Sequence, residues 1–67
     1  MVSYKPLWKL LIEKDMKKGD LCKLTRISPT TLAKLNRGEN VGVERLEKIC
    51  KVLDCDIGDI VRIEEDK

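Results

Sequence analysis

The sequence predicts an all-α domain, and three observations carry that prediction. Residues 43–53 have an amphipathic helical pattern, residues 28–38 carry the end signals of a short helix, and the chain is only 67 residues long. That length corresponds to one domain, 1–67, near the lower limit at which a single core holds a fold without disulfides or metals. With one Trp, one Tyr and no Phe, the core must consist of Leu, Ile and Val.

The first two helices are predicted from apolar spacing. The first runs from about Lys5 to Asp15, with Pro6 tolerated in its first turn. Its predicted buried face consists of Leu7, Leu10 and Leu11, widened by Trp8 and Ile12. The second helix covers residues 17–25, where Leu21 and Leu24 lie three positions apart.

The third helix, residues 29–37, has the clearest end signals in the chain. Ser28 is a strong N-cap, and Pro29 follows at the first helical position, where its fixed φ is already helical. Ile27 and Leu32 have the spacing of a hydrophobic staple. Gly38 suits a left-handed C-cap, which ends the helix.

The surface of this third helix is unusually short of large apolar side chains. Leu32 and Leu35 supply one apolar edge. The residues expected to face elsewhere are Thr30, Thr31, Ala33, Lys34 and Arg37. Two short helices joined by about three residues, 26–28, have the helix-turn-helix geometry, in which the second helix enters the major groove of DNA.

The remaining chain predicts two more helical elements. After a loop over residues 38–42, the fourth helix runs from about Val43 to Leu53, with an apolar stripe. The residues of that stripe are Val43, Leu46, Ile49, Cys50 and Leu53. Asp56 then caps a fifth helical turn over residues 57–61.

The two ends of the chain both alternate in the manner of strands. Residues 2–4 and 61–63 could pair, within one chain or between two. Because an isolated two-stranded pair is marginal, frayed ends are slightly favoured over pairing.

The charge is divided unequally along the chain. Residues 1–37 hold nine Lys and Arg against three acids, a net charge of +6, whereas residues 38–67 hold five against nine, a net charge of −4. The basic half contains the predicted helix-turn-helix, as a surface that faces phosphates requires. The acidic half is expected to point away from DNA.

The sequence offers no pattern for catalysis or for a cofactor. It has no His, and its three cysteines, Cys22, Cys50 and Cys55, lack the paired spacing of a zinc site. We expect them to be small buried hydrophobes. No nucleophile–base arrangement or glycine-rich phosphate loop occurs, so we expect neither an enzyme nor a bound cofactor or metal.

The motif ISPTTLAKLNRGENV, followed by VERLEKICKVLDC and DIGDIV, resembles the Cro/repressor (Xre-like, lambda-repressor-like) helix-turn-helix family over about residues 5–61. The resemblance implies a compact five-helix domain with its helix-turn-helix at about 17–37. It implies a sequence-specific transcriptional regulator of double-stranded DNA.

The chain departs from the family pattern at four positions. Arg26 stands where a small residue, often Gly, is usual in the turn, and Cys22 stands where Ala is common. Lys18 and Pro29 replace glutamines that contact phosphate and base edges in the family. Since Pro29 cannot make that base contact, readout must shift along the third helix.

On this basis we assign candidate DNA contacts. Thr30 and Lys34 are expected to reach base edges, Thr31 to touch base or backbone, and Ala33 to contact a thymine methyl. Phosphates are expected to be held by Lys17, Lys18, Ser28, Arg37 and Asn40.

A single helix-turn-helix reads few base pairs, so we expect a weak or DNA-induced homodimer. A cytoplasmic location is expected, since no stretch of the sequence suits a membrane span or a signal peptide. The alternative function is a protein-interaction module, an antitoxin or adaptor, with its partner bound at the fourth helix and its acidic flank. That flank comprises Glu44, Glu47, Asp54, Asp56 and Asp59.

Overall fold

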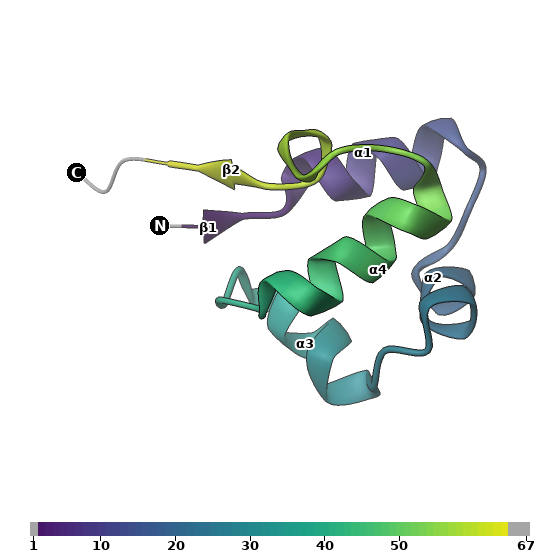
Figure 1. The fold of residues 1–67 in the computed structure, drawn as a ribbon, viewed down its shortest axis with the longest axis horizontal. Helices are drawn as coiled ribbons and strands as arrows, with labels where there is room; N and C mark the ends of the chain where they lie inside the picture. Colours follow the sequence, from purple (N-terminus) through teal and green to yellow (C-terminus); the bar gives the residue numbers. More distant parts are fainter. Residues whose placement is uncertain (1, 65–67) are drawn as a thin grey trace.

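The computed structural model describes residues 2–64, so residues 1 and 65–67 of the predicted domain lie outside it. The described chain is mostly helical, with a small sheet (Figure 1). In chain order its elements are β1 (Val2–Ser3), α1 (Lys5–Glu13), α2 (Lys18–Thr25), α3 (Pro29–Arg37), α4 (Val43–Leu53), a 3-10 turn η1 (Ile57–Asp59) and β2 (Arg62–Ile63).

The predicted fifth helix is a single 3-10 turn, so the expectation of five helices is wrong for the described residues, which hold four α-helices. The Asp56 N–H donates to the Asp59 carboxylate at 3.0 Å, which organises the start of the turn, and the turn ends after Asp59 because Ile60 leaves the helical conformation, with φ −120°. The chain then extends into β2. The first helix is also shorter than predicted, because Asp15 adopts the left-handed conformation with φ 57° and reverses the chain.

The chain ends pair rather than fray. β1 and β2 are antiparallel, with Val2 opposite Ile63 and Ser3 opposite Arg62, and Figure 1 shows the two strands side by side. The physical reason is anchoring just inside each strand. Tyr4 after β1 and Ile60 before β2 are both buried, so the core fixes the two ends next to each other.

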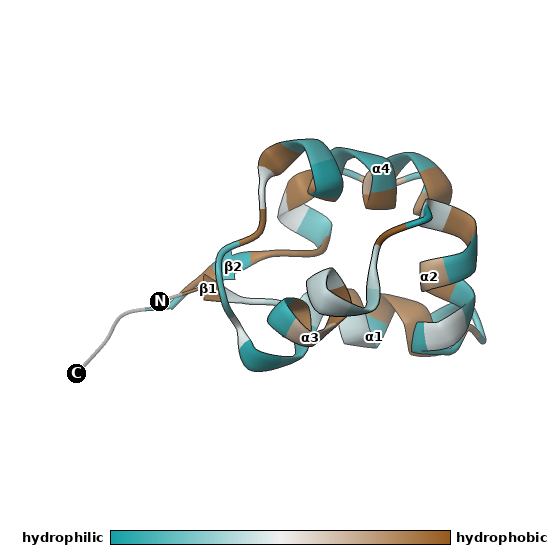
Figure 2. Ribbon diagram, turned by 90° about the horizontal axis from the view of Figure 1, so that it is seen from below, coloured by the Kyte–Doolittle hydropathy of each residue, from teal (hydrophilic) through white to brown (hydrophobic). Residues whose placement is uncertain are grey.

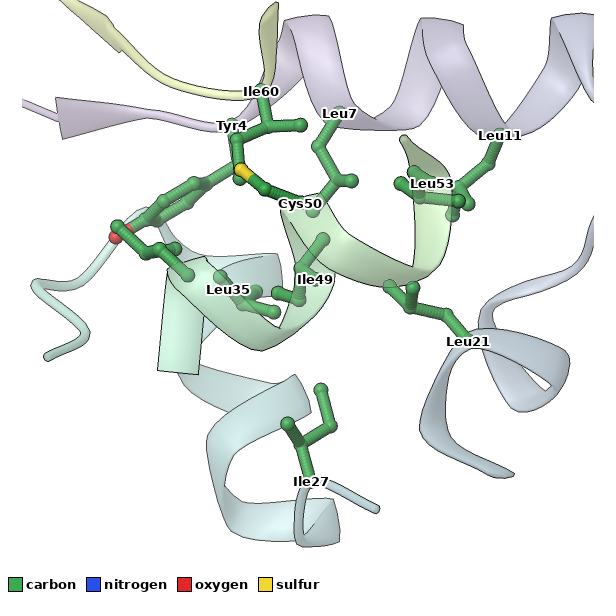
Figure 3. Close-up of a cluster of buried hydrophobic side chains, with 11 residues drawn as sticks. Tyr4, Leu7, Leu11, Leu21, Ile27, Leu35, Ile49, Cys50, Leu53 and Ile60 are labelled. Atoms are coloured by element: carbon green, nitrogen blue, oxygen red, sulfur yellow. The ribbon is translucent and has the colours of Figure 1, made fainter. Parts of the chain in front are cut away.

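Leucine and isoleucine side chains from all four helices form the core (Figure 3). The residues that are essentially inaccessible are Leu7, Leu21, Leu35, Ile49, Leu53 and Ile60. Cys50 is buried among them, and Cys22 and Cys55 pack against the edge of the core. Burial raises the pKa of the Cys55 thiol to about 11, so this thiol stays protonated at neutral pH.

Three residues predicted for buried faces are exposed: Ile12, Leu24 and Val43. Thr25 is buried in place of Leu24. Its hydroxyl donates to the Leu21 carbonyl at 2.7 Å, so the buried hydroxyl has a hydrogen-bond partner within the helix. Ile12 directly follows the buried Leu11, so it lies on a different face of α1, close to the end of the helix. Val43 is the first residue of α4 and precedes its first core contact, Leu46.

Figure 2 shows how hydropathy is distributed over this fold. Every helix carries hydrophobic segments that alternate with hydrophilic ones. No helix among residues 2–64 combines the length and the apolar character needed to cross a bilayer.

Candidate nucleic-acid interface

Three residues, 26–28, join α2 to α3, as the helix-turn-helix prediction requires. Arg26 adopts the left-handed conformation, with φ 59° and ψ 26°, and its N–H donates to the Cys22 carbonyl at 2.8 Å. A side chain in this conformation is strained, which explains why a small residue suits the position. The turn buries Ile27 and leaves Arg26 and Ser28 at the surface.

The start of α3 is organised around Ser28. Its Oγ accepts the Thr31 N–H at 3.2 Å and lies 3.1 Å from the Thr31 hydroxyl. Pro29 follows the cap and Gly38 ends the helix with φ 71°, so both predicted end signals are confirmed. These bonds fix the first turn of α3 relative to the turn before it.

The burial of Thr31 differs from the prediction. Only 6% of the residue is exposed, and its hydroxyl lies 3.1 Å from Ser28 Oγ, so the expectation that Thr31 stands out at the surface is wrong. Thr31 nevertheless lines the same hollow as Thr30 and Lys34, and its contact with base or backbone stays a prediction. Its position supports the N-cap.

The other predicted residues of α3 lie at the surface. Thr30, Lys34 and Arg37 are exposed and Ala33 is half-buried. Thr30, Thr31 and Lys34 line one hollow together with Ser28 and Asn40. The fold therefore brings three predicted base-reading residues next to two predicted phosphate-binding residues.

Sequence reasoning missed three cations beside this surface. Arg45 lines the same hollow as Thr30 and Lys34. Arg45 also lines a neighbouring hollow with Arg26, Ser28 and Lys48. Arg45 and Lys48 belong to the half of the chain with a net negative charge, so the charge count gave no reason to expect them at a DNA-binding surface. The sequence signal for them is their spacing of three residues on α4, outside the buried stripe, which places both on one exposed face.

Lys17 and Lys18 stand at the start of α2. The Lys17 N–H donates to the Asp20 carboxylate at 3.1 Å, which caps the helix. The Lys18 ammonium lies 4.3 Å from the centre of the Trp8 ring and donates to Asn36 Oδ1 at 2.6 Å. Lys18 thus links α1, α2 and α3, and its ammonium keeps two further donors.

Arg37 forms an ion pair with Glu39 just after α3. The hydrogen bond from Arg37 lowers the pKa of the Glu39 carboxyl, so this carboxylate is charged at neutral pH. Both side chains are about half exposed, at 59% and 48%. Arg37 therefore presents less free positive charge than Lys34 or Arg45.

Comparisons with known proteins agree with this geometry. The family model of the Cro/C1-type helix-turn-helix DNA-binding domain matches residues 6–66. The crystal structure of the transcriptional regulator VanUg, form II, is similar, with a TM-score of 0.89 and 52% sequence identity over 91% of this chain and 81% of that chain. No curated protein sequence matches the chain significantly.

Proposed function

Because the chain belongs to the Cro/C1-type helix-turn-helix DNA-binding domain family, we propose that it regulates transcription by binding specific duplex sites with α3 in the major groove. The observation that carries this proposal is the hollow shared by Ser28, Thr30, Lys34, Asn40 and Arg45. It places short polar side chains on α3 beside donors from the loop and α4. The similar regulator VanUg supports the transcriptional role.

The proposal divides the exposed residues by the DNA groups they contact. Thr30 and Lys34 read base edges, Thr31 touches base or backbone, and Ala33 contacts a thymine methyl. Phosphate contacts come from exposed residues at the start of α2, around α3 and on α4: Lys17, Lys18, Ser28, Arg37, Asn40 and, in addition, Arg26, Arg45 and Lys48. The chain acts by binding alone, without catalysis or a cofactor, and we expect it in the cytoplasm with the DNA.

Lys34→Ala tests this division directly. The variant should lose preference at one base position, with a cost of about 1–3 kcal/mol on the preferred site, because Lys34 reads a base edge. Lys17→Ala should weaken binding to all sequences alike, since a phosphate contact carries no sequence information. Affinities for the preferred duplex and single-base variants, measured for both proteins, check this. If the two variants behaved identically, the assignment of α3 to the major groove would be wrong.

We also propose that two copies bind one site. A single α3 contacts too few base pairs to discriminate within a genome, whereas a two-fold dimer reads two half-sites about 34 Å apart. The surfaces available for a weak or DNA-induced contact are the β1–β2 sheet, where Ile63 is 75% exposed, and the outer face of α4, where Val43 is 63% exposed. Such a dimer predicts a palindromic site.

A further inference from the structure

The loop of residues 38–42 follows α3 and is held from the other end of the chain. The Tyr4 ring is 3% exposed and points from the start of α1 toward this loop (Figure 3). Its hydroxyl donates to the Glu39 carbonyl at 2.9 Å, and the nearby Val41 backbone lowers the pKa of the same hydroxyl. Glu39 and Val41 are the neighbours of Asn40 on either side.

Tyr4 remains a hydrogen-bond donor at neutral pH. Burial raises the pKa of its hydroxyl above the usual value near 10, and the Val41 backbone opposes this only in part. A buried hydroxyl without a partner costs free energy, and the hydrogen bond to the Glu39 carbonyl offsets that cost.

Strand β1 lies close to the start of the same loop. The Val2 carbonyl oxygen would lie 3.1 Å from a Cβ at Gly38, whose φ of 71° already favours glycine. A side chain at position 38 would therefore crowd the β1 backbone, which pairs with β2. The loop thus begins beside β1 and is hydrogen-bonded to Tyr4 at Glu39.

Asn40 itself is exposed and lines the hollow with Thr30 and Lys34. We infer that Tyr4 is a positioning residue for DNA binding, whose hydroxyl fixes the loop backbone at Glu39, next to Asn40, and so aims the Asn40 amide at a phosphate beside α3. The inference rests on the proposed function. Within Tyr4 the ring fills the core, whereas the hydroxyl holds the loop backbone.

The test compares Tyr4→Phe, Asn40→Ala and the double variant, using a duplex selected by the wild-type protein. Tyr4→Phe keeps the ring and should lower affinity about 2- to 10-fold, the effect of one lost neutral hydrogen bond. Asn40→Ala should lower affinity to a similar degree. The double variant should bind no more weakly than Asn40→Ala alone, because Tyr4 acts through Asn40.

Ile49→Val is the matched control, since it removes one methylene from the buried face of α4 without touching the loop. It should bind DNA like the wild type at a temperature where thermal melting shows every variant folded. Amide exchange at Val41 should be faster in Tyr4→Phe and unchanged in Ile49→Val.

Several results would overturn the inference. They are wild-type affinity in Tyr4→Phe, wild-type affinity in Asn40→Ala, or losses that multiply in the double variant. If the wild-type protein failed to retard any duplex, the proposed function itself would be wrong. That outcome is distinct from the results above, which contradict only the role of Tyr4.

Discussion

Replacing Leu35 with Ala should lower the melting temperature by at least about 8 °C and leave much of the protein unfolded at room temperature. Leu35 is 1% exposed and attaches α3 to the core. Truncating such a leucine costs on the order of 2–5 kcal/mol, through lost burial and the cavity left behind. A domain of this size has a total margin of only about 3–10 kcal/mol, so the loss is a large part of it.

Leu46→Ala should behave in the same way, because Leu46 is 6% exposed and belongs to the buried stripe of α4. Leu24→Ala is the matched control: the same substitution at a residue that is 59% exposed should leave the melting curve nearly unchanged. Thermal unfolding followed by circular dichroism measures all three. An unchanged curve for Leu35→Ala or Leu46→Ala would contradict the packing of α3 and α4.

DNA affinity should fall by a factor of about 10³ or more between 50 mM and 200 mM salt, if two copies together neutralise about six phosphates. The cations available to each copy are exposed and include Lys17 before α2, Arg37 at the end of α3 and Arg45 in the hollow beside Thr30 and Lys34. Each contact releases a condensed counterion, so affinity falls linearly on a double logarithmic plot. Titration of a labelled duplex at several salt concentrations gives the slope.

Lys17→Ala should flatten that slope by about one for each copy bound. Lys51→Ala, a change at an exposed lysine in the last turn of α4, is the control and should leave the slope as it is. Indifference to duplex DNA at about 50 mM salt would contradict the proposal and favour the protein-interaction alternative.

The parts of the fold that follow from local chemistry were predictable. α3 begins at Pro29 and ends at Arg37 because Ser28 and Gly38 satisfy the free groups at its two ends, and both signals are visible in the sequence. α4 also has its predicted bounds, 43–53. The end of α1 depends on a left-handed Asp15, for which the sequence carries no comparable signal.

Features that depend on tertiary contacts could not be predicted in the same way. The β1–β2 pair exists because Tyr4 and Ile60 enter one core from opposite ends of the chain. In a helix as short as α2, the pattern alone does not decide between Leu24 and Thr25 as the buried residue. Hydrogen bonding of the Thr25 hydroxyl within the helix decides it.

The candidate interface shows the same division. Lys34 and Thr30 are exposed on α3 as predicted, and their role toward bases remains a prediction. Thr31 was misplaced because its side chain takes part in the cap at Ser28, a use that apolar periodicity does not register. Arg45 reaches the hollow only because the loop of residues 38–42, which also lines it, brings the start of α4 beside it.

Selection from a pool of random duplex DNA, read by sequencing, tests the central claim most directly. The wild-type protein should enrich one motif with dyad symmetry, its half-sites spaced by about 34 Å, since two α3 helices enter successive turns of the major groove. Lys34→Ala should enrich the same motif with preference lost at one position of each half-site. A pool that stays random after selection, or a motif without any dyad that holds one protein per duplex, would contradict the account.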